Sequence, residues 1–106
     1  MSRVRFRGEL QGFQSGKQGL EIRLAAEQIM FSRCVKALDY VHTAQPITLR
    51  LMANKGGGLV ISAMLKAMLF DWHGIAFRIV VPQPDELQAL MNMVEKPVLV
   101  DIGEAE

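Results

Sequence analysis

The segment of residues 4–10 alternates strictly between two kinds of side chain, and this alternation constrains the fold more than any other feature. Apolar residues or glycine occupy every second position and charged residues fill the others: Val4, Phe6, Gly8 and Leu10 against Arg5, Arg7 and Glu9. A period of two predicts a β-strand with one buried and one solvated face. The same period returns in residues 20–24, after a loop rich in glycine and glutamine. The two segments are therefore predicted to pair as a hairpin.

The period changes after residue 30. A three-and-four spacing predicts an amphipathic helix that ends before Pro46, with this buried stripe: Cys34, Val35, Leu38, Val41 and His42. Strands are predicted at residues 47–52, 58–61, 75–81 and 98–102, and the first two of these form a second hairpin. A run of helix formers at residues 63–69, opened by Ser62 as N-cap, predicts a second helix. A last helix is predicted to begin near Pro84 and to end at Pro97.

Mixed strands and helices with tight hairpins indicate an α+β domain. The predicted fold is a mostly antiparallel sheet with helices packed on one face. A length of 106 residues suits a single domain. Within it, residues 1–16 are predicted to form an N-terminal extension with an extra strand, and residues 101–106 an acidic tail.

Charge is balanced overall but not along the chain. Lysine and arginine number 12 against 11 acids, a formal net charge of +1, so we expect no binding to nucleic acid. The first residues are rich in arginine (Arg3, Arg5 and Arg7), whereas the last are acidic. This asymmetry predicts a frayed acidic tail; the alternative is an attraction between the two ends.

Cys34 is the only cysteine, so an internal disulfide is excluded and a reducing compartment is expected. The N-terminus lacks the apolar core of a signal peptide. The longest apolar stretches are interrupted by Lys66 and Arg78 and are too short to span a bilayer. The sequence therefore predicts a cytoplasmic protein without membrane contact.

The order of these elements resembles the HPr phosphocarrier family, whose fold is an open-faced sandwich. The resemblance covers residues 17–100: Arg33 falls on the arginine near the family's active site, Asn54-Lys55 on its hairpin turn, and Ser62 on its regulatory serine. The family carries phosphate on a histidine two residues before that arginine, where this chain has Phe31. The resemblance therefore implies a regulatory or docking module of the phosphotransferase type that is not a histidine phosphocarrier.

A second resemblance is to the STAS family of anti-sigma antagonists. It is carried by residues 20–24 and by the strand at residues 75–81. The acidic-serine-serine-glycine motif of that family is missing around residues 58–62. Topology separates the two, because a STAS sheet contains parallel strands joined by helical crossovers.

Ser62 is the candidate regulatory site, since a phosphate there would lie at a helix N-terminus; the alternative is a simple N-cap. The other residues predicted to contact a partner protein are Phe31, Arg33, Lys55, Met64, Leu65 and Met68. Methionine adapts to varied partners, although core packing is an equal alternative for these side chains. The N-terminal strand is predicted to support a homodimer.

We expect no catalytic residue, metal or cofactor. Cys34 on a buried stripe is poorly placed for reaction, and His42 and His73 lack companions at ligand spacing. The glycines after Lys55 reverse the order of a P-loop and indicate a hairpin turn. A small anion-binding domain or enzyme that uses Arg33, Lys55, Ser62 and His73 stays open as an alternative function.

Overall fold

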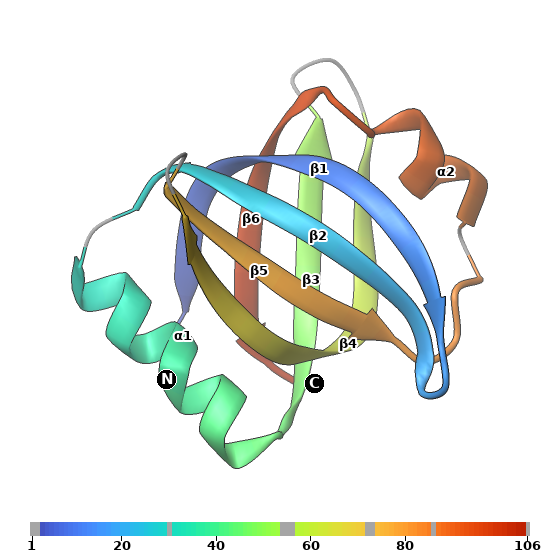
Figure 1. Ribbon diagram of the computed structural model, residues 1–106. Helices are drawn as coiled ribbons and strands as arrows, with labels where there is room; N and C mark the ends of the chain where they lie inside the picture. Colours follow the sequence, from blue (N-terminus) through green and yellow to red (C-terminus); the bar gives the residue numbers. More distant parts are fainter. Residues whose placement is uncertain (1–2, 30, 54–56, 72–73, 86, 106) are drawn as a thin grey trace.

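The strands of this chain close into a barrel. The computed structural model describes residues 3–29, 31–53, 57–71, 74–85 and 87–105, and these form six strands and two helices. The strands are β1 (Val4–Gly16), β2 (Gly19–Gln28), β3 (Pro46–Ala53), β4 (Gly58–Asp71), β5 (Gly74–Val81) and β6 (Pro97–Glu104). Neighbouring strands pair antiparallel in the order β1-β2-β5-β4-β3-β6, and β6 returns to β1 (Figure 1).

The interior of the barrel takes every second side chain of each strand. In β1 these include Val4, Phe6 and Leu10, which are all buried. The ring of Phe6 packs against that of Phe77, with centroids 5.2 Å apart. The other strands complete the core with Ile22, Leu24, Ile47, Leu49, Leu51, Leu59, Ile61, Ala63, Leu65, Ile79, Val81, Val98, Val100 and Ile102.

Two helices add to this core and lie on opposite sides of the barrel (Figure 1). The first, α1 (Phe31–Thr43), connects β2 to β3 and packs against β4 and β1. The second, α2 (Leu87–Asn92), lies between β5 and β6 and buries Leu90. Neither of these described helices has the length and apolar character needed to span a membrane.

Both predicted hairpins are confirmed. β1 pairs with β2, with Gly16 opposite Gly19 at the turn, and β3 pairs with β4. The strands predicted at residues 75–81 and 98–102 are confirmed as β5 and as part of β6. β1 also pairs with β6 on its second side, so the N-terminal strand is part of the barrel wall.

The predicted α+β open-faced sandwich, with helices packed on one face of a sheet, is wrong. The segment predicted as its second helix, residues 63–69, belongs to β4, which pairs with both β3 and β5. These residues favour helix individually, but the two-sided pairing and the burial of Ala63 and Leu65 outweigh that preference. All pairs among the described strands are antiparallel, so the parallel topology of a STAS sheet is not observed either.

The predicted buried stripe of α1 is also partly wrong. Cys34 is buried as predicted, but Val35 and Leu38 are exposed by 46% and 37%. The other buried residues of α1 are Ala37 and Tyr40, which were not in the predicted stripe. This face turns toward β4 and β1, where the small Ala37 side chain allows close approach of the helix.

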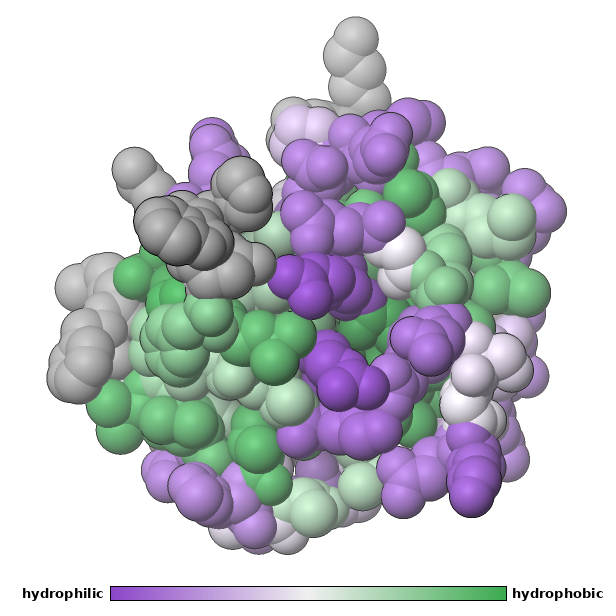
Figure 2. Space-filling view, viewed as in Figure 1, coloured by the Kyte–Doolittle hydropathy of each residue, from purple (hydrophilic) through white to green (hydrophobic). Residues whose placement is uncertain are grey.

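A band of hydrophilic residues crosses the face formed by β2 and β5 (Figure 2). On the outer side of these strands, Glu21 binds Lys66 Nζ at 2.5 Å and an Arg78 guanidinium nitrogen at 2.7 Å. The hydrogen bond from Arg78, followed by that from Lys66, lowers the pKa of Glu21 below its ordinary value of 4.5. Glu21 thus joins three strands, β2, β4 and β5, by charge-assisted contacts.

Replacing Glu21 with glutamine is expected to destabilise the protein at neutral pH but not in strong acid. A carboxyl whose folded pKa is lowered stabilises the fold above its unfolded pKa, and this stabilisation is lost as pH falls through the folded pKa. Urea unfolding of Glu21→Gln and wild type, at neutral pH and in acid, measures the difference. Glu27→Gln, at an exposed position, is the control. A Glu21→Gln deficit that persists unchanged in acid contradicts this prediction.

Candidate functional site

Arg5 and Arg7 project outward from β1, and Arg3 lies directly before that strand. Arg3, Arg5 and Arg7 are exposed because the positions between them face the core. The two-residue period of a strand separates them by about 7 Å each. The register then places Arg5 beside Asp101 on β6, and Asp101 beside Arg50 on β3. A row of charged residues therefore crosses three neighbouring strands.

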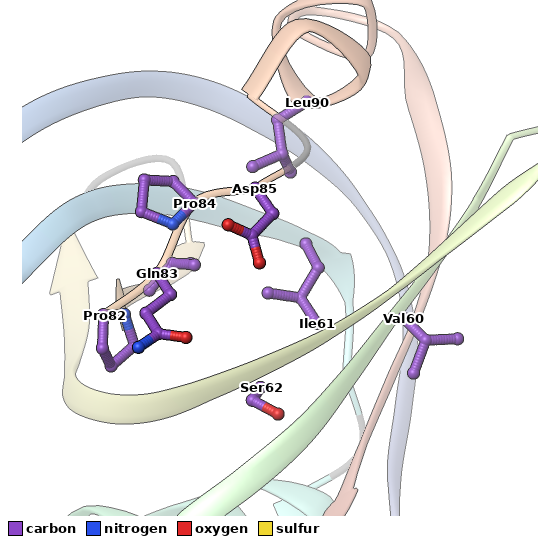
Figure 3. Close-up of a pocket in the computed structure, with 9 residues that line it drawn as sticks. Val60, Ile61, Ser62, Pro82, Gln83, Pro84, Asp85 and Leu90 are labelled. Atoms are coloured by element: carbon purple, nitrogen blue, oxygen red, sulfur yellow. The ribbon is translucent and has the colours of Figure 1, made fainter.

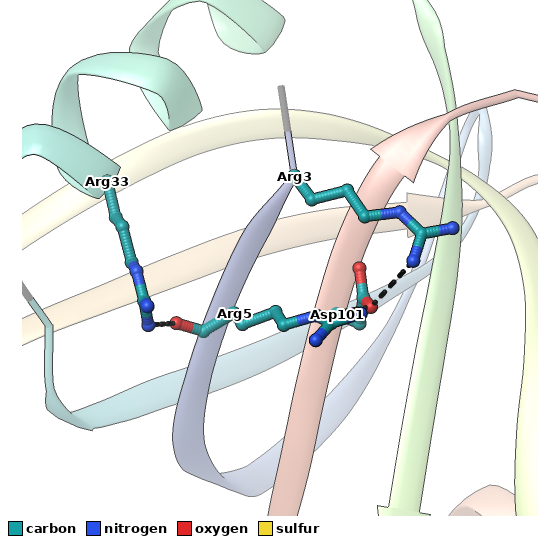
Figure 4. A network of polar contacts seen from close by, with 4 residues as sticks. All are labelled: Arg3, Arg5, Arg33 and Asp101. Atoms are coloured by element: carbon teal, nitrogen blue, oxygen red, sulfur yellow. Dashed lines mark hydrogen bonds and ion pairs between the residues drawn. The ribbon is translucent and has the colours of Figure 1, made fainter. Parts of the chain in front are cut away.

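Asp101 is the buried centre of this cluster, with 3% of its surface exposed. Its Oδ2 accepts a hydrogen bond from Arg5 Nε at 3.0 Å and lies 3.6 Å from a guanidinium nitrogen of Arg3 (Figure 4). Arg33 of α1 donates a hydrogen bond to the backbone oxygen of Arg5. Asp101 Oδ1 is buried and has no hydrogen-bond partner among the described residues. A buried carboxylate is costly unless it is paired, so these arginines are what make Asp101 tolerable here.

Two exposed apolar side chains lie next to the arginines. Leu99 is the register partner of Arg7 on one side and of Met52 on the other. Leu99 and Met52 are 42% and 40% exposed. We call this surface the arginine–apolar face, and its members are Arg3, Arg5, Arg7, Arg33, Arg50, Met52, Leu99 and Asp101.

The arginine–apolar face is positive although the whole chain is nearly neutral. Five of the seven arginines of the chain lie on it, against the buried carboxylate of Asp101 and, at its edge, the exposed Glu9 that follows Arg7 on the outer side of β1. Arginine presents a planar fork of donors that matches a carboxylate or a phosphate oxygen pair. Chemically, the face is suited to bind an anionic group beside an apolar one.

A pocket of about 330 Å³ lies between β4 and the segment that follows β5 (Figure 3). Val60, Ile61 and Ser62 line it from β4. Its opposite wall is residues 82–85, and Leu90 of α2 also contributes. The pocket is mixed in character, because the exposed residues Ser62, Gln83 and Asp85 lie among apolar side chains.

No family model, curated protein or solved structure matches this chain. The described residues also contain no group of three His, Cys, Asp or Glu side chains placed to hold a metal ion.

Of the predicted site residues, Arg33 is the described one that lies on the arginine–apolar face. Ser62 is exposed and lines the pocket, but it lies within β4 and does not cap a helix. Leu65 is 2% exposed and faces the core, which matches the alternative of core packing given for it. Met64 and Met68 are half-buried on the same strand. Lys55 and the side chain of Phe31 lie outside the described part of the chain.

Sequence reasoning missed most of the arginine–apolar face. The alternation of residues 4–10 marks Arg5 and Arg7 as outward residues of a strand, and Arg3 lies two residues before Arg5. Asp101 was assigned to a frayed acidic tail, and this is wrong because residues 101–104 belong to β6. The ion pairs of Arg3 and Arg5 with Asp101 instead match the alternative, an attraction between the two ends.

Cys34 is buried, and desolvation raises the pKa of its thiol. Because the thiolate is the reactive form, we expect a thiol reagent to modify native Cys34 at least about tenfold more slowly than the unfolded chain. The measurement is the rate of reaction with a chromogenic disulfide, with and without denaturant. Ser15→Cys combined with Cys34→Ala places the thiol at an exposed site and should react similarly in both conditions. Equal rates for native and unfolded Cys34 contradict the prediction.

Proposed function

We propose that this chain is a non-catalytic module that docks onto an acidic segment of a partner protein through its arginine–apolar face. The observation that carries the proposal is the row of Arg5, Asp101 and Arg50, with exposed Leu99 and Met52 beside it. Arginine and methionine are enriched in protein interfaces, whereas lysine and glutamate are depleted. The composition of this face follows that pattern.

Charge identifies the kind of partner. The five arginines outnumber the carboxylates of Asp101 and of the bordering Glu9, and the Asp101 carboxylate is buried and already paired with Arg3 and Arg5. Positive surfaces attract acidic partners and accelerate their association. Exposed Leu99 and Met52 add an apolar contact, so the favoured segment carries acidic residues next to apolar ones.

Asp101 has a positioning role in this proposal. Its carboxylate holds the Arg5 side chain at 3.0 Å and keeps the Arg3 guanidinium close. Arginine side chains lose rotamer entropy when they bind, and holding them beforehand reduces that cost. The buried charge thus serves binding more directly than it serves stability.

A cytoplasmic location is part of the proposal. The single cysteine is free and buried. Such a thiol suits a reducing compartment, where disulfides are rare.

The experiment uses two synthetic peptides that share alternating leucines and differ in having glutamate or glutamine between them. Wild type is expected to bind the glutamate peptide more tightly, and added salt should weaken that binding. The double variant Arg5→Gln/Arg7→Gln should lose roughly tenfold or more in affinity, since each lost bond to a charged group is worth about 1.5–3 kcal/mol. Fluorescence anisotropy of labelled peptides measures both effects.

The matched control is Lys17→Gln/Lys36→Gln, which removes the same charge from two exposed positions outside the arginine–apolar face. It should retain the affinity of wild type. Equal binding of the two peptides, or an equal loss in the control variant, contradicts the proposal. Tighter binding of a single-stranded oligonucleotide than of either peptide would also overturn it, in favour of a nucleic-acid function.

A further inference from the structure

The barrel wall has an opening along β4. β4 (Gly58–Asp71) is longer than β5 (Gly74–Val81), and β5 pairs with β4 only from Met64 onward, where Met64 lies opposite Val80. Residues 58–63 pair with β3 on their other side. Among the described residues, no backbone hydrogen bond joins residues 58–63 to residues 82–85.

Two prolines explain why the pairing stops. Pro82 directly follows β5 and Pro84 lies two residues further along. Proline has no backbone N–H to donate to a neighbouring strand. The chain therefore leaves the sheet at Pro82, while β4 continues. Half of the backbone groups of an antiparallel strand point to each side, and those of residues 58–63 on this side have no backbone partner among the described residues.

The pocket of about 330 Å³ occupies this opening. Figure 3 shows Ile61 of β4 directed toward Asp85, with Gln83 on the opposite wall and Leu90 at one end, whereas the Ser62 side chain at the next strand position points away from Gln83. A volume of this size is at the lower limit of sites that hold ligands in proteins. An occupant here would meet backbone edge groups, apolar side chains and the Asp85 carboxylate together.

The edge lacks the usual protection. Exposed strand edges normally carry lysine, proline or a bulge that prevents pairing with another chain. Residues 58–63 read Gly-Leu-Val-Ile-Ser-Ala, without a charge or a proline, and Val60 is 61% exposed. An uncharged segment of high β-propensity at an open edge is a hazard unless something covers it.

We infer that the edge of β4 at residues 58–63 binds an extended peptide of a partner protein, which adds to the barrel as a strand. The alternating donors and acceptors of an extended backbone match those of the edge, and alternate side chains of the peptide enter the pocket. Leu90 and Ile61 favour an apolar side chain there, and Asp85 favours a basic or hydrogen-bond-donating one. This site is separate from the arginine–apolar face. It favours a basic peptide, whereas the arginine–apolar face favours an acidic one.

The test selects short random linear peptides by phage display on the protein of residues 1–106 and measures the affinity of the synthesised peptides that are enriched. Two variants fill the pocket from opposite walls, Ser62→Tyr and Gln83→Tyr, both at exposed positions. Each is expected to weaken binding roughly tenfold or more, about 1.4 kcal/mol. Ser15→Tyr, at an exposed position near the β1–β2 turn, is the matched control and should bind like wild type. Arg5→Gln/Arg7→Gln should also keep its affinity for these peptides.

A second measurement tests the binding mode. Methylating one peptide nitrogen at a time should abolish binding at every second residue of the bound segment, because only alternate N–H groups face β4. The inference is overturned if no peptide is enriched, if both tyrosine variants bind as wild type does, or if methylation shows no alternation. A wild-type dimer that Ser62→Tyr converts to monomer would also overturn it, since the edge would then pair with a second copy.

Discussion

Replacing Phe77 with alanine is expected to lower the free energy of unfolding by about 3–5 kcal/mol. Phe77 is fully buried and is among the largest of the buried side chains. Its ring contacts that of Phe6, with centroids 5.2 Å apart, and such aromatic pairs add about 0.5–1.5 kcal/mol beyond buried area. A barrel interior leaves little room for neighbours to collapse into the cavity, which places the cost high in this range.

Urea unfolding followed by circular dichroism measures this effect. Phe70→Ala is the matched control, because the same side chain is 68% exposed there. A surface change of this kind is expected to alter stability by no more than about 0.5 kcal/mol. If Phe77→Ala costs no more than Phe70→Ala, then Phe77 is not part of a packed interior.

Gly19→Ala is expected to lower the free energy of unfolding by at least about 1–3 kcal/mol. Gly19 has a φ of +137°, a backbone conformation that residues other than glycine rarely adopt. A Cβ at this position would lie 2.5 Å from the backbone oxygen of Val81 and 2.8 Å from the Cα of Pro82. Both atoms belong to the backbone of the neighbouring strand and its exit, so neither can move aside cheaply.

Gly12→Ala tests whether this loss comes from the site and not from the residue type. A Cβ at Gly12 meets no atom within 4 Å, and its φ lies outside the left-handed region. Alanine at such a position is expected to leave stability unchanged or to raise it by about 0.4–1 kcal/mol. The thermal unfolding midpoint should therefore fall for Gly19→Ala and stay level or rise for Gly12→Ala, and equal shifts contradict the prediction.

Local patterns predicted the parts of this fold that depend on neighbours close in sequence. The alternation around Phe6 and Leu24 identified β1 and β2, and the turn chemistry of residues 53–56 identified the second hairpin. Both hairpins join strands that are adjacent along the chain, so period and turn residues are sufficient to locate them.

The misplaced elements depend on distant contacts. Residues 63–69 have the composition of a helix, and only their pairing with β3 and β5 makes them a strand. Sequence preference is weak against two-sided pairing, and no local signal reports the presence of a second neighbour. The expectation of an open sheet covered by helices followed directly from that one misassigned segment.

The candidate site could not be predicted from the sequence either, because it too depends on contacts between residues distant in sequence. Arg5 and Asp101 are 96 residues apart in sequence, and the register of β1 with β6 brings them to 3.0 Å. Their opposite charges were visible in the sequence, but the partner strand was not. Leu65 and Ser62 were predicted to lie together on an exposed helix, but both belong to β4, where Leu65 faces the core and Ser62 faces solvent. A helix and a strand present different residues to solvent.

Closure of the barrel between its first and last strands has a consequence for synthesis on the ribosome. β1 is synthesised well before its partner β6, which begins only at Pro97. Contacts between such distant segments make folding slow. Until β6 emerges, β1 and β3 both lack a neighbour on the side that it fills. We therefore expect chains that stop before Pro97 to expose two strand edges at once and to aggregate or be degraded.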